Sequence, residues 1–426
     1  MKIHVAAAGE SLFSIALHYG VPLEQLVLDN GIAAANELVV GQTLVVRFPM
    51  ETYTVRPGDT LRAIARKTGL SLRELLVKNP ILAGEDTLTT GQMLTVCFET
   101  EPSASLAVLG YAYPHIAPGF LRSVLPYLTC LAPFTHRVTG EGELISPAVE
   151  TLLTMADELA VSTVLHLSTS DEQGRFQSDW AALILADESL QSRLIAQIGQ
   201  TLYHKGYRSI AVNFEYVYPE DARRYADFIR RLTSTFNPFG VPVTVALVPK
   251  SSDSQSGLLH EGHDYQALGA AANSVLLMTC ERSYAHRPPM PVVPLPQAQA
   301  VVEYALSRIP AEKIIMGIPN YGCDWTLPFV SGVSRTTSIG NAEAIQLARH
   351  YGAEIFFDEA SSSPYFTYTA GDGLAHIVHF EDARSMEARL ALAIKQGLYG
   401  VSYWNLMHSF PQNWRLLASL SRMFPT

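Results

Sequence analysis

Between residues 106 and 406, short segments rich in β-branched and aromatic residues alternate with longer segments of helical periodicity. This alternation limits the possible folds more than any other feature of the sequence, because it is typical of a parallel sheet covered by helices. The predicted strands are residues 106–111, 127–134, 162–168, 209–215, 242–248, 274–279, 313–319 and 400–406. The predicted helices are residues 146–159, 180–204, 222–236, 265–272, 296–307 and 385–396. Eight strands over about 320 residues predict an α/β fold of the (β/α)8 TIM barrel type.

One long interval separates the last two predicted strands. It contains a helical segment at residues 342–351 and short strand-like segments at 356–358, 364–368 and 376–380. We therefore expect a small α+β insertion, at about residues 323–383, that forms one wall of a cleft at the barrel mouth.

The fourth predicted strand ends in a carboxylate. Ile210, Val212 and Phe214 share one face of this strand, so Asn213 and Glu215 share the other. Chemistry in such barrels occurs at the carboxyl ends of the strands, which makes Glu215 a candidate catalytic acid. The structural alternative is that Glu215 caps the next helix or pairs with an arginine of that helix.

Composition argues against several classes of partner. The 426 residues are 48% hydrophobic and 16% charged, as expected for two or three globular domains. The net charge of −10 argues against nucleic acid and anionic membranes as partners. No apolar run is long enough to span a bilayer, so no membrane segment is expected.

The sequence predicts no metal and no cofactor. Its four cysteines are scattered and indicate neither a disulfide framework nor a zinc site. The segment His260-Glu261-Gly262-His263 lacks the H-E-x-x-H spacing that places two imidazoles on one helical face. The N-terminus shows no secretory signal, which predicts synthesis in the cytoplasm.

The first hundred residues contain an internal repeat. Gly9-Glu10-Ser11-Leu12 recurs as Gly58-Asp59-Thr60-Leu61, and Asn30 recurs as Asn79, at a constant spacing of 49 residues. Each copy predicts a strand, two short helices and a second strand, a β-α-α-β module. Ser11 and Thr60 are suited to cap the first helix of each copy.

These residues resemble the LysM family, whose members bind glycans that contain N-acetylglucosamine. We expect one LysM module at residues 2–48 and a second at residues 52–98. The resemblance implies a glycan groove in each copy, between the loop after the first strand and the loop after the second helix. The alternative is that one copy only packs against the rest of the chain, and Ala6-Ala7-Ala8 points to the first copy. The implied groove residues are Gly9, Glu10, Ser11, Leu12 and Asn30 in the first copy, and Gly58, Asp59, Thr60, Leu61, Asn79 and Ile81 in the second.

Residues 105–426 carry a second resemblance. The segment Val212-Asn213-Phe214-Glu215 is similar to the family 18 glycoside hydrolase strand that ends in the general acid. Met278-Thr279-Cys280-Glu281 resembles the sixth strand of that family, and Gly400-Val401-Ser402-Tyr403-Trp404 resembles the last. Further segments, such as Gly317-Ile318-Pro319-Asn320-Tyr321-Gly322, resemble the cortex-lytic N-acetylglucosaminidases of spore germination, which carry two LysM modules before the barrel.

That resemblance implies cleavage of N-acetylglucosaminyl β-1,4 bonds in peptidoglycan of the spore cortex. In the substrate-assisted retaining mechanism of this family, the 2-acetamido oxygen of the sugar attacks its own anomeric carbon. Glu215 would serve as acid and then as base, and Asn213 would orient the acetamide. The implied substrate-binding residues are Glu281, Trp404, Tyr111, Asn320, Tyr321 and Tyr284.

The sequence departs from the family at three positions near this site. Asn213 replaces an Asp, Ala211 replaces a polar residue, and Cys280 replaces a Tyr. The loss of one preorganised electrostatic partner commonly lowers the rate on the order of 10²–10³-fold. Two function classes therefore stay open: a glycosidase of reduced activity, and a glycan-binding or spore-coat protein on a degenerate barrel. In either case we expect a monomer at the spore coat or cortex, made in the mother cell, with peptidoglycan as its partner.

Overall fold

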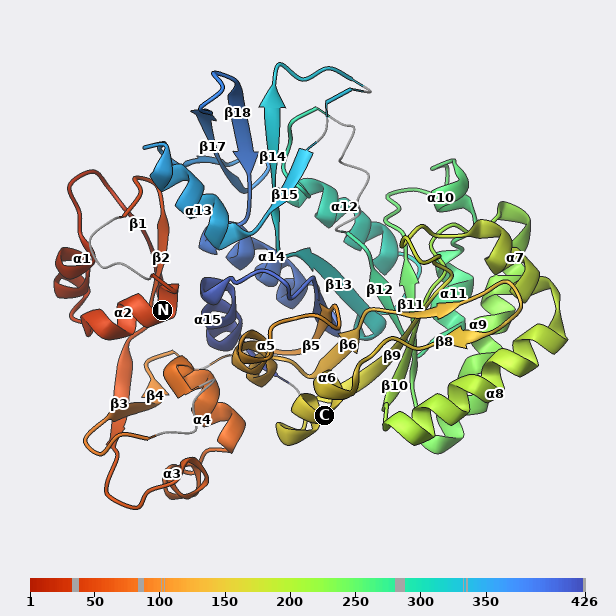
Figure 1. The fold of residues 1–426 in the computed structure, drawn as a ribbon, viewed down its shortest axis with the longest axis horizontal. Coiled ribbons are helices and arrows are strands. Elements are labelled where there is room, and N and C mark those ends of the chain that lie inside the picture. Colours follow the sequence, from red (N-terminus) through yellow and green to blue (C-terminus); the bar gives the residue numbers. More distant parts are fainter. Residues whose placement is uncertain are drawn as a thin grey trace.

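The computed structural model describes residues 1–32, 38–82, 88–100, 102, 104–279, 288–331, 333–334 and 336–423. Two small N-terminal modules lie side by side against one flank of a large barrel domain, and a smaller lobe rises from the barrel next to the first module (Figure 1).

Eight parallel strands close into a barrel. They are β5 (Ala104–Ala112), β6 (Cys130–Pro133), β9 (Ser162–Ser168), β10 (Ser209–Asn213), β11 (Val243–Leu247), β12 (Ser274–Leu277), β13 (Ile314–Pro319) and β19 (Gly400–Trp404). Each pairs with the next in this order, and pairing of β19 with β5 closes the ring. The predicted (β/α)8 barrel is confirmed.

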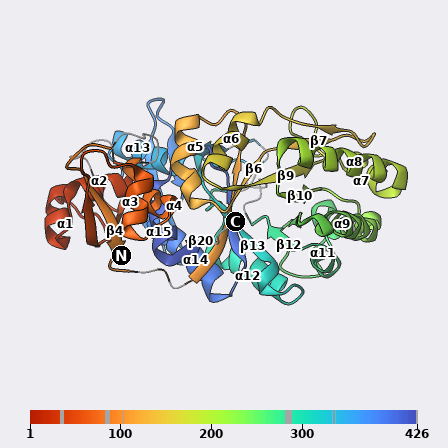
Figure 2. The ribbon, with the colours of Figure 1, turned by 90° about the horizontal axis from the view of Figure 1, so that it is seen from below.

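Helices cover the outside of the barrel (Figure 2). They are α5 (Pro118–Val124), α6 (Glu150–Glu158), α7 (Ser178–Ala186), α8 (Glu188–Lys205), α9 (Ala222–Phe236), α10 (Leu258–Glu261), α11 (Tyr265–Ala271), α12 (Leu295–Leu306), α14 (Ala383–Lys395) and α15 (Pro411–Leu420). The prediction of one helix over residues 180–204 is wrong. The chain breaks at Asp187, because its carboxylate caps α8 by accepting hydrogen bonds from the amides of Ser189 and Leu190. Strands β7 (His136–Val138), β8 (Leu144–Ile145) and β20 (Ser421–Met423) extend the sheet and were not predicted.

The two faces of β10 pack into different cores. Ile210, Val212 and Phe214 belong to the large cluster between the barrel and its helices. Ala211 belongs to a second cluster, inside the barrel, together with Tyr111. The predicted alternation is therefore confirmed, and it points the residues on the parity of Ala211 into the barrel.

The insertion after β13 is built on an antiparallel sheet. It comprises β14 (Gly322–Leu327), β15 (Thr336–Ile339), α13 (Asn341–His350), β16 (Phe356–Asp358), β17 (Ser363–Thr369) and β18 (Ala375–His379). The strands lie in the order β15-β14-β18-β17-β16. The predicted α+β insertion is confirmed, although β14 and β15 were missed.

The two N-terminal modules share one architecture. The first consists of β1 (Lys2–Val5), α1 (Leu12–Tyr19), α2 (Leu23–Asn30) and β2 (Thr43–Val46). The second consists of β3 (Pro49–Thr54), α3 (Leu61–Thr68), α4 (Leu72–Lys78) and β4 (Met93–Phe98), with a short 3-10 turn at Pro80–Leu82. Each has its own small apolar core. Ser11 and Thr60 cap α1 and α3 as predicted.

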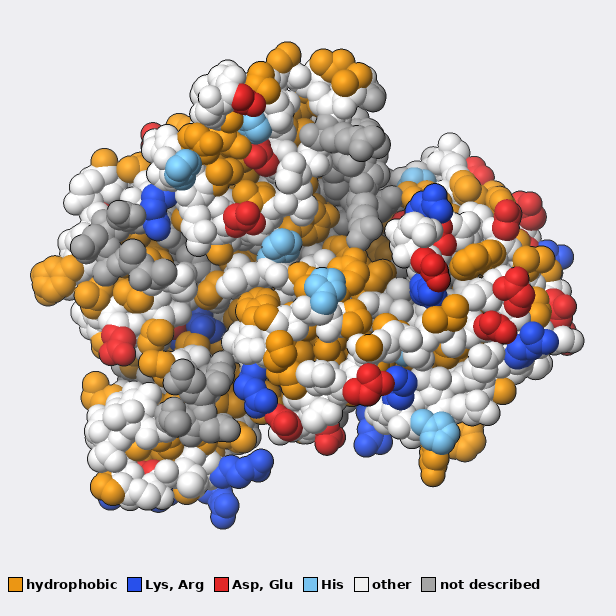
Figure 3. Space-filling model, in the orientation of Figure 1, with side chains coloured by type: hydrophobic (Ala, Val, Ile, Leu, Met, Phe, Trp, Pro, Cys, Tyr) orange, Lys and Arg blue, Asp and Glu red, His pale blue; other side chains and the backbone are white. Residues whose placement is uncertain are grey.

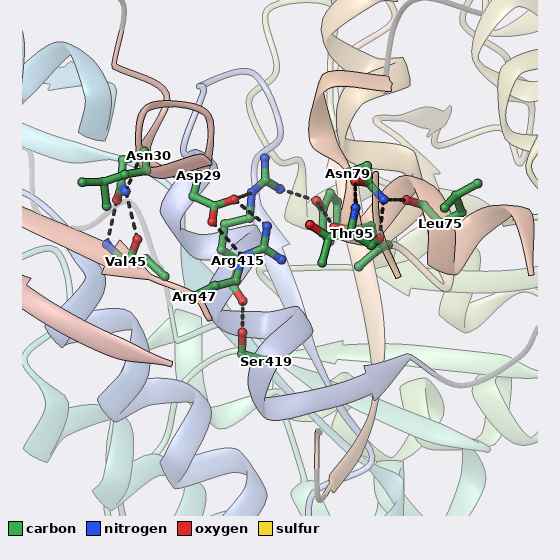
Figure 4. A network of polar contacts seen from close by, with 12 residues as sticks. Asp29, Asn30, Val45, Arg47, Leu75, Asn79, Thr95, Arg415 and Ser419 are labelled. Carbon is green, nitrogen blue, oxygen red and sulfur yellow. Dashed lines mark hydrogen bonds and ion pairs between the residues drawn. The ribbon is translucent and has the colours of Figure 1, made fainter. Parts of the chain in front are cut away.

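A buried ion cluster joins the first module to the barrel (Figure 4). Asp29 accepts a hydrogen bond from Nε of Arg47 at 3.0 Å and lies 3.4 Å from Nε of Arg415 on α15. All three side chains are almost fully buried. The carboxylate of Asp29 therefore neutralises charge at a place where unpaired cations are costly.

We expect Asp29→Ala to lower the free energy of unfolding by about 3–5 kcal/mol, because it leaves two buried guanidinium groups without their counter-ion. Denaturant titration measures this change. Lys78→Ala is the matched control, since Lys78 occupies the equivalent position of the second module and is only half-buried. Equal effects of the two substitutions would contradict a structural role for the Asp29 cluster.

Candidate active site

A cavity of about 370 Å³ lies at the carboxyl ends of the barrel strands. Its walls combine aromatic rings with a few polar groups, as is usual for ligand sites. The lining residues include Tyr111, Tyr113, Phe134, His166, Glu172, Phe176, Asn213, Glu215, Met278, Ser402 and Trp404. The structure thus brings together four residues predicted from sequence: Glu215, Asn213, Trp404 and Tyr111.

Glu215 lies two residues beyond the last residue of β10 and is half-buried. The buried ring of His263 fixes the backbone at this point, because its Nε2 donates a hydrogen bond to the carbonyl oxygen of Glu215 at 3.0 Å. Arg224, one of the arginines proposed as a structural partner, pairs instead with Asp221 at 2.6 Å. Glu215 is therefore held at the cavity by its backbone, with its side chain among the lining groups.

Asn213 is the last residue of β10 and is only 6% exposed. Among the described residues, its Oδ1 atom has no hydrogen-bond partner. A buried amide oxygen without a partner is costly, and it is expected where a ligand supplies the missing donor. Asn213 and Glu215 lie on the same inward parity of the chain, and both line the same cavity.

Aromatic side chains form the wall opposite β10. The ring of Trp404 is half-buried and meets Phe134 at a centroid distance of 4.8 Å and an angle of 77°. Tyr111 and Tyr113 lie 5.5 Å and 6.2 Å from the same ring. These contacts fix the orientation of Trp404 at the cavity, which suits stacking against the apolar face of a sugar ring.

His166 brings a neutral imidazole to the cavity floor. It is 1% exposed, its Nδ1 lies 2.7 Å from Oγ1 of Thr135, and it is paired across the sheet with Ala211. Burial, helped by the nearby His136, lowers the pKa of His166 to about 3. The ring is therefore uncharged at neutral pH and adds no positive charge beside Asn213.

We expect acidification to destabilise the fold. Burial lowers the pKa of His166 to about 3 and that of His263 to about 4, from an ordinary value of 6.5. Below pH 6.5 the unfolded chain therefore binds protons that the folded chain does not, so stability is lost as the pH falls. Each histidine should cost about 2 kcal/mol between pH 7 and pH 5.

Denaturant titrations at the two pH values measure this loss. In His263→Gln the difference between pH 7 and pH 5 should shrink by about 2 kcal/mol. The control is His350→Gln, which removes an exposed histidine in place of a buried one. An unchanged pH dependence in His263→Gln would contradict the assignment of a neutral buried ring.

Two predicted substrate-binding residues lie outside the cavity lining. Asn320 is buried, and its Nδ2 donates to the carbonyl oxygens of Asn405 at 2.8 Å and His408 at 2.9 Å. It therefore braces the loop that follows Trp404, while its buried Oδ1 has no partner among the described residues. The predicted substrate contact stays a prediction. Tyr321 packs against the apolar cluster beside the insertion and does not line the cavity.

Other predicted residues cannot be placed. Glu281 and Tyr284, together with Cys280, lie outside the described residues. Conversely, Phe134 and His166 were not predicted as site residues. Their signal was present in the sequence, because both occupy the inward parity near the carboxyl ends of predicted strands.

The predicted groove residues of the two modules fall into two groups. Asn30 and Asn79 are buried, and each amide is used within its own module by backbone groups. They tie the second helix to the closing strand, and their predicted contact with glycan stays a prediction. Ser11 and Thr60 remain at exposed loop ends. Hydrogen bonds, the strongest from Lys67, lower the pKa of Asp59 to about 2.

No metal-binding cluster of three or more His, Cys, Asp or Glu side chains occurs within the described ranges. Over the same ranges, every helix is too short or too polar to cross a membrane.

Comparison with known proteins places the chain in a family. The model described as glycosyl hydrolases family 18 matches residues 170–408, which is more than half of the chain. The chain belongs to family 18. The LysM domain model also matches, at residues 4–47 and 53–96. The barrel is thus a family 18 domain, and the two N-terminal modules are LysM domains.

Relatives are similar over the full length. The cortical fragment-lytic enzyme of Bacillus cereus is 35% identical over 98% of this chain and 97% of its own. The crystal structure of the Bacillus megaterium QM B1551 spore cortex-lytic enzyme SleL superimposes with a TM-score of 0.84 at 32% identity, covering 100% of this chain and 99% of the other. A chitinase from Chromobacterium violaceum ATCC 12472 matches with a TM-score of 0.68 at 26% identity, covering 74% of this chain and 98% of the other. Of the two function classes left open by the sequence, membership of family 18 supports the first, the glycosidase.

Proposed function

We propose that this family 18 protein cleaves N-acetylglucosaminyl β-1,4 bonds in peptidoglycan fragments of the spore cortex. The observation that carries the proposal is the buried Oδ1 of Asn213, which has no hydrogen-bond partner among the described residues and lines one cavity with Glu215 and the ring of Trp404. An amide acceptor, an acid and an aromatic platform match the three parts of an N-acetylglucosaminyl unit: its acetamide, its bridging oxygen and its ring.

In the proposed reaction, the proton of Glu215 passes to the bridging oxygen as the bond to the anomeric carbon breaks. The acetamido oxygen of the same sugar forms a bond to that carbon and gives an oxazolinium ion. Asn213 accepts a hydrogen bond from the acetamido N–H through Oδ1, which aligns the oxygen for attack. Water then adds to the anomeric carbon, Glu215 takes its proton, and the acetamide is restored with retention of configuration.

This chain has Asn213 where the family has an Asp, and this difference sets the catalytic rate that we expect. An amide oxygen holds the acetamide, but it supplies no negative charge beside the oxazolinium ion. Ala211, the residue two positions earlier, adds no polar group. We therefore propose a working enzyme that is slower than relatives with Asp at this position.

We further propose that the protein acts as a monomer on the spore, where peptidoglycan is both its substrate and the ligand of its LysM domains. The domain limits that we propose are 2–48, 52–98 and 105–426, with the insertion at about 323–383. Substrate contacts by Glu281 and Tyr284 stay predictions.

The test is turnover of purified cortex fragments, followed by NMR of the first product formed. We expect new reducing ends carrying N-acetylglucosamine, released as the β-anomer before mutarotation. An α-anomer product would contradict the retaining mechanism. If the unmodified chain releases reducing ends no faster than the Glu215→Gln variant does, the protein is a glycan-binding protein and not an enzyme.

A further inference from the structure

The first LysM domain contacts the insertion through the end of its loop after α2, which forms one wall of the predicted groove. This wall, residues 39–43, ends the loop after α2 and begins β2. Val39 is 5% exposed and packs in the core of the insertion with Ile355. The amide of Ile355 donates to the carbonyl oxygen of Val40 at 2.9 Å. Gly41 lies so close that a Cβ atom there would overlap the carbonyl oxygen of Ile355. The wall is therefore sealed against the insertion by backbone contacts.

The same wall also contacts the barrel. Nε2 of Gln412 on α15 donates to the carbonyl oxygen of Thr43 at 2.6 Å and to Oδ1 of Asn30 at 3.1 Å. The hydroxyl of Thr43 accepts a hydrogen bond from the amide of Ala383, at the start of α14, at 3.3 Å. No room is left for a glycan along residues 39–43.

The second LysM domain leaves the equivalent wall in solvent. Residues 89–93 correspond to residues 39–43, since Gly91-Gln92 repeats Gly41-Gln42. A Cβ atom at Gly91 would meet no described heavy atom within 4 Å. Met93 is 67% exposed, whereas its counterpart Thr43 is 1% exposed. One fold thus buries this wall in its first copy and exposes it in its second.

The ion cluster that anchors the first domain is also specific to that copy (Figure 4). Asp29 and Arg47 form the buried pair beside Arg415. The corresponding residues of the second domain are Lys78 and Cys97, which cannot form such a pair. The anchoring chemistry is therefore absent from the second copy.

The second domain contacts the barrel through a different surface, the outer face of α4. Nε of Arg73 donates to the carbonyl oxygen of Pro126 at 2.7 Å, and the hydroxyl of Tyr127 donates to the carbonyl oxygen of Val77 at 3.2 Å.

The predicted groove side of the second domain stays exposed. Ile81, in the turn after α4, is 45% exposed. Much of the surface of the two domains on the face in Figure 3 is uncharged, apart from scattered charged groups such as the basic side chains at the lower edge of the second domain. Such a surface suits a neutral sugar chain.

We infer that the two LysM domains have different tasks: the second captures the glycan, and the first is a brace that fixes the insertion and α15 to each other. This inference rests on the proposed function, because it assumes a glycan polymer with N-acetylglucosamine as the ligand. It assigns glycan capture to the loop around Gly58 to Leu61 together with Ile81 and residues 89–91.

A matched pair of substitutions tests the division. Ala8→Arg and Pro57→Arg each place a long cation in an exposed loop next to the groove glycine of one copy. The full-length variants are mixed with insoluble cortex peptidoglycan, and the bound fraction is measured after sedimentation. We expect Pro57→Arg to weaken binding at least tenfold and Ala8→Arg to leave it unchanged. Equal losses in both variants, or a loss confined to Ala8→Arg, would overturn the inference.

A second pair tests the brace. Gly41 and Gly91 both have positive φ, +84° and +90°, so alanine strains the backbone in both copies alike. Only at Gly41 does the added methyl group also meet the insertion. We expect Gly41→Ala to lower the Tm of the barrel by on the order of 5 °C. Gly91→Ala should leave this Tm unchanged. Equal shifts would show that the first domain does not brace the barrel.

The unmodified chain separates the two claims. If it binds and cleaves cortex peptidoglycan while the paired variants behave alike, the division of tasks is wrong and the proposed function stands. If it neither binds nor cleaves this polymer, the proposed function is wrong, and the comparison of Gly41→Ala with Gly91→Ala still decides whether the first domain is a brace.

Discussion

Glu215→Gln should lower kcat/KM for cortex fragments by about 10⁴-fold, the upper end of what a general acid contributes, because one residue serves both half-reactions. Glutamine has nearly the same shape as glutamate but carries no acidic proton. The backbone contact from His263 should hold it in the same place. Initial rates of reducing-end release measure the effect.

The control for Glu215→Gln is binding. The variant should hold a chitooligosaccharide as tightly as the unmodified chain does, with an unchanged Tm. A loss of activity together with a loss of folding would say nothing specific about acid catalysis, so both properties are measured on one preparation. A fall in kcat/KM of less than tenfold would contradict the assignment of Glu215 as the acid.

Asn213→Ala should lower kcat by about 10²–10³-fold, because it removes the group that aligns the acetamide in the transition state. Its effect on KM should be smaller, since Trp404 and the other aromatic residues still bind the sugar ring. Steady-state kinetics on a soluble N-acetylglucosamine oligomer measure both constants.

Asn213→Asp is the matched variant. A carboxylate accepts the same hydrogen bond and adds negative charge beside the oxazolinium ion, so this variant should be at least as active as the unmodified chain. If Asn213→Asp were as inactive as Asn213→Ala, the amide N–H groups of Asn213, and not its Oδ1 atom, would be the essential part of the side chain.

Much of the barrel could be predicted from the sequence, because each strand is specified by the pattern of apolar residues within its own short segment. The run from Ile210 to Phe214 alternates between two apolar environments, and that alternation also gave the direction of Asn213 and Glu215. The break at Asp187 was missed because a single capping side chain ends one helix and begins the next without a glycine or proline. Strand β14 was missed because Gly322–Leu327 lacks a clear alternation of apolar and polar residues.

The rest of the site depends on contacts between distant parts of the chain. Asn320 looked like a substrate contact, but it serves a loop about 85 residues away, at Asn405. Likewise, Asn30 accepts a hydrogen bond from Gln412, across a separation of 382 residues. No periodicity within a segment reports such pairs, so the sequence could not predict these contacts for either residue. The two LysM copies share one motif. Ala6-Ala7-Ala8 sets the first copy apart in sequence, but the contacts that bury it against the insertion and the barrel are visible only in the structure.

The most direct measurement is a crystal structure of the Glu215→Gln chain with a bound N-acetylglucosamine oligomer. We predict one pyranose ring over Trp404, with its acetamido nitrogen about 2.8–3.2 Å from Oδ1 of Asn213 and the bridging oxygen next to residue 215. An acetamide that points away from Asn213, or an oligomer bound outside this cavity, would contradict substrate-assisted cleavage by this barrel.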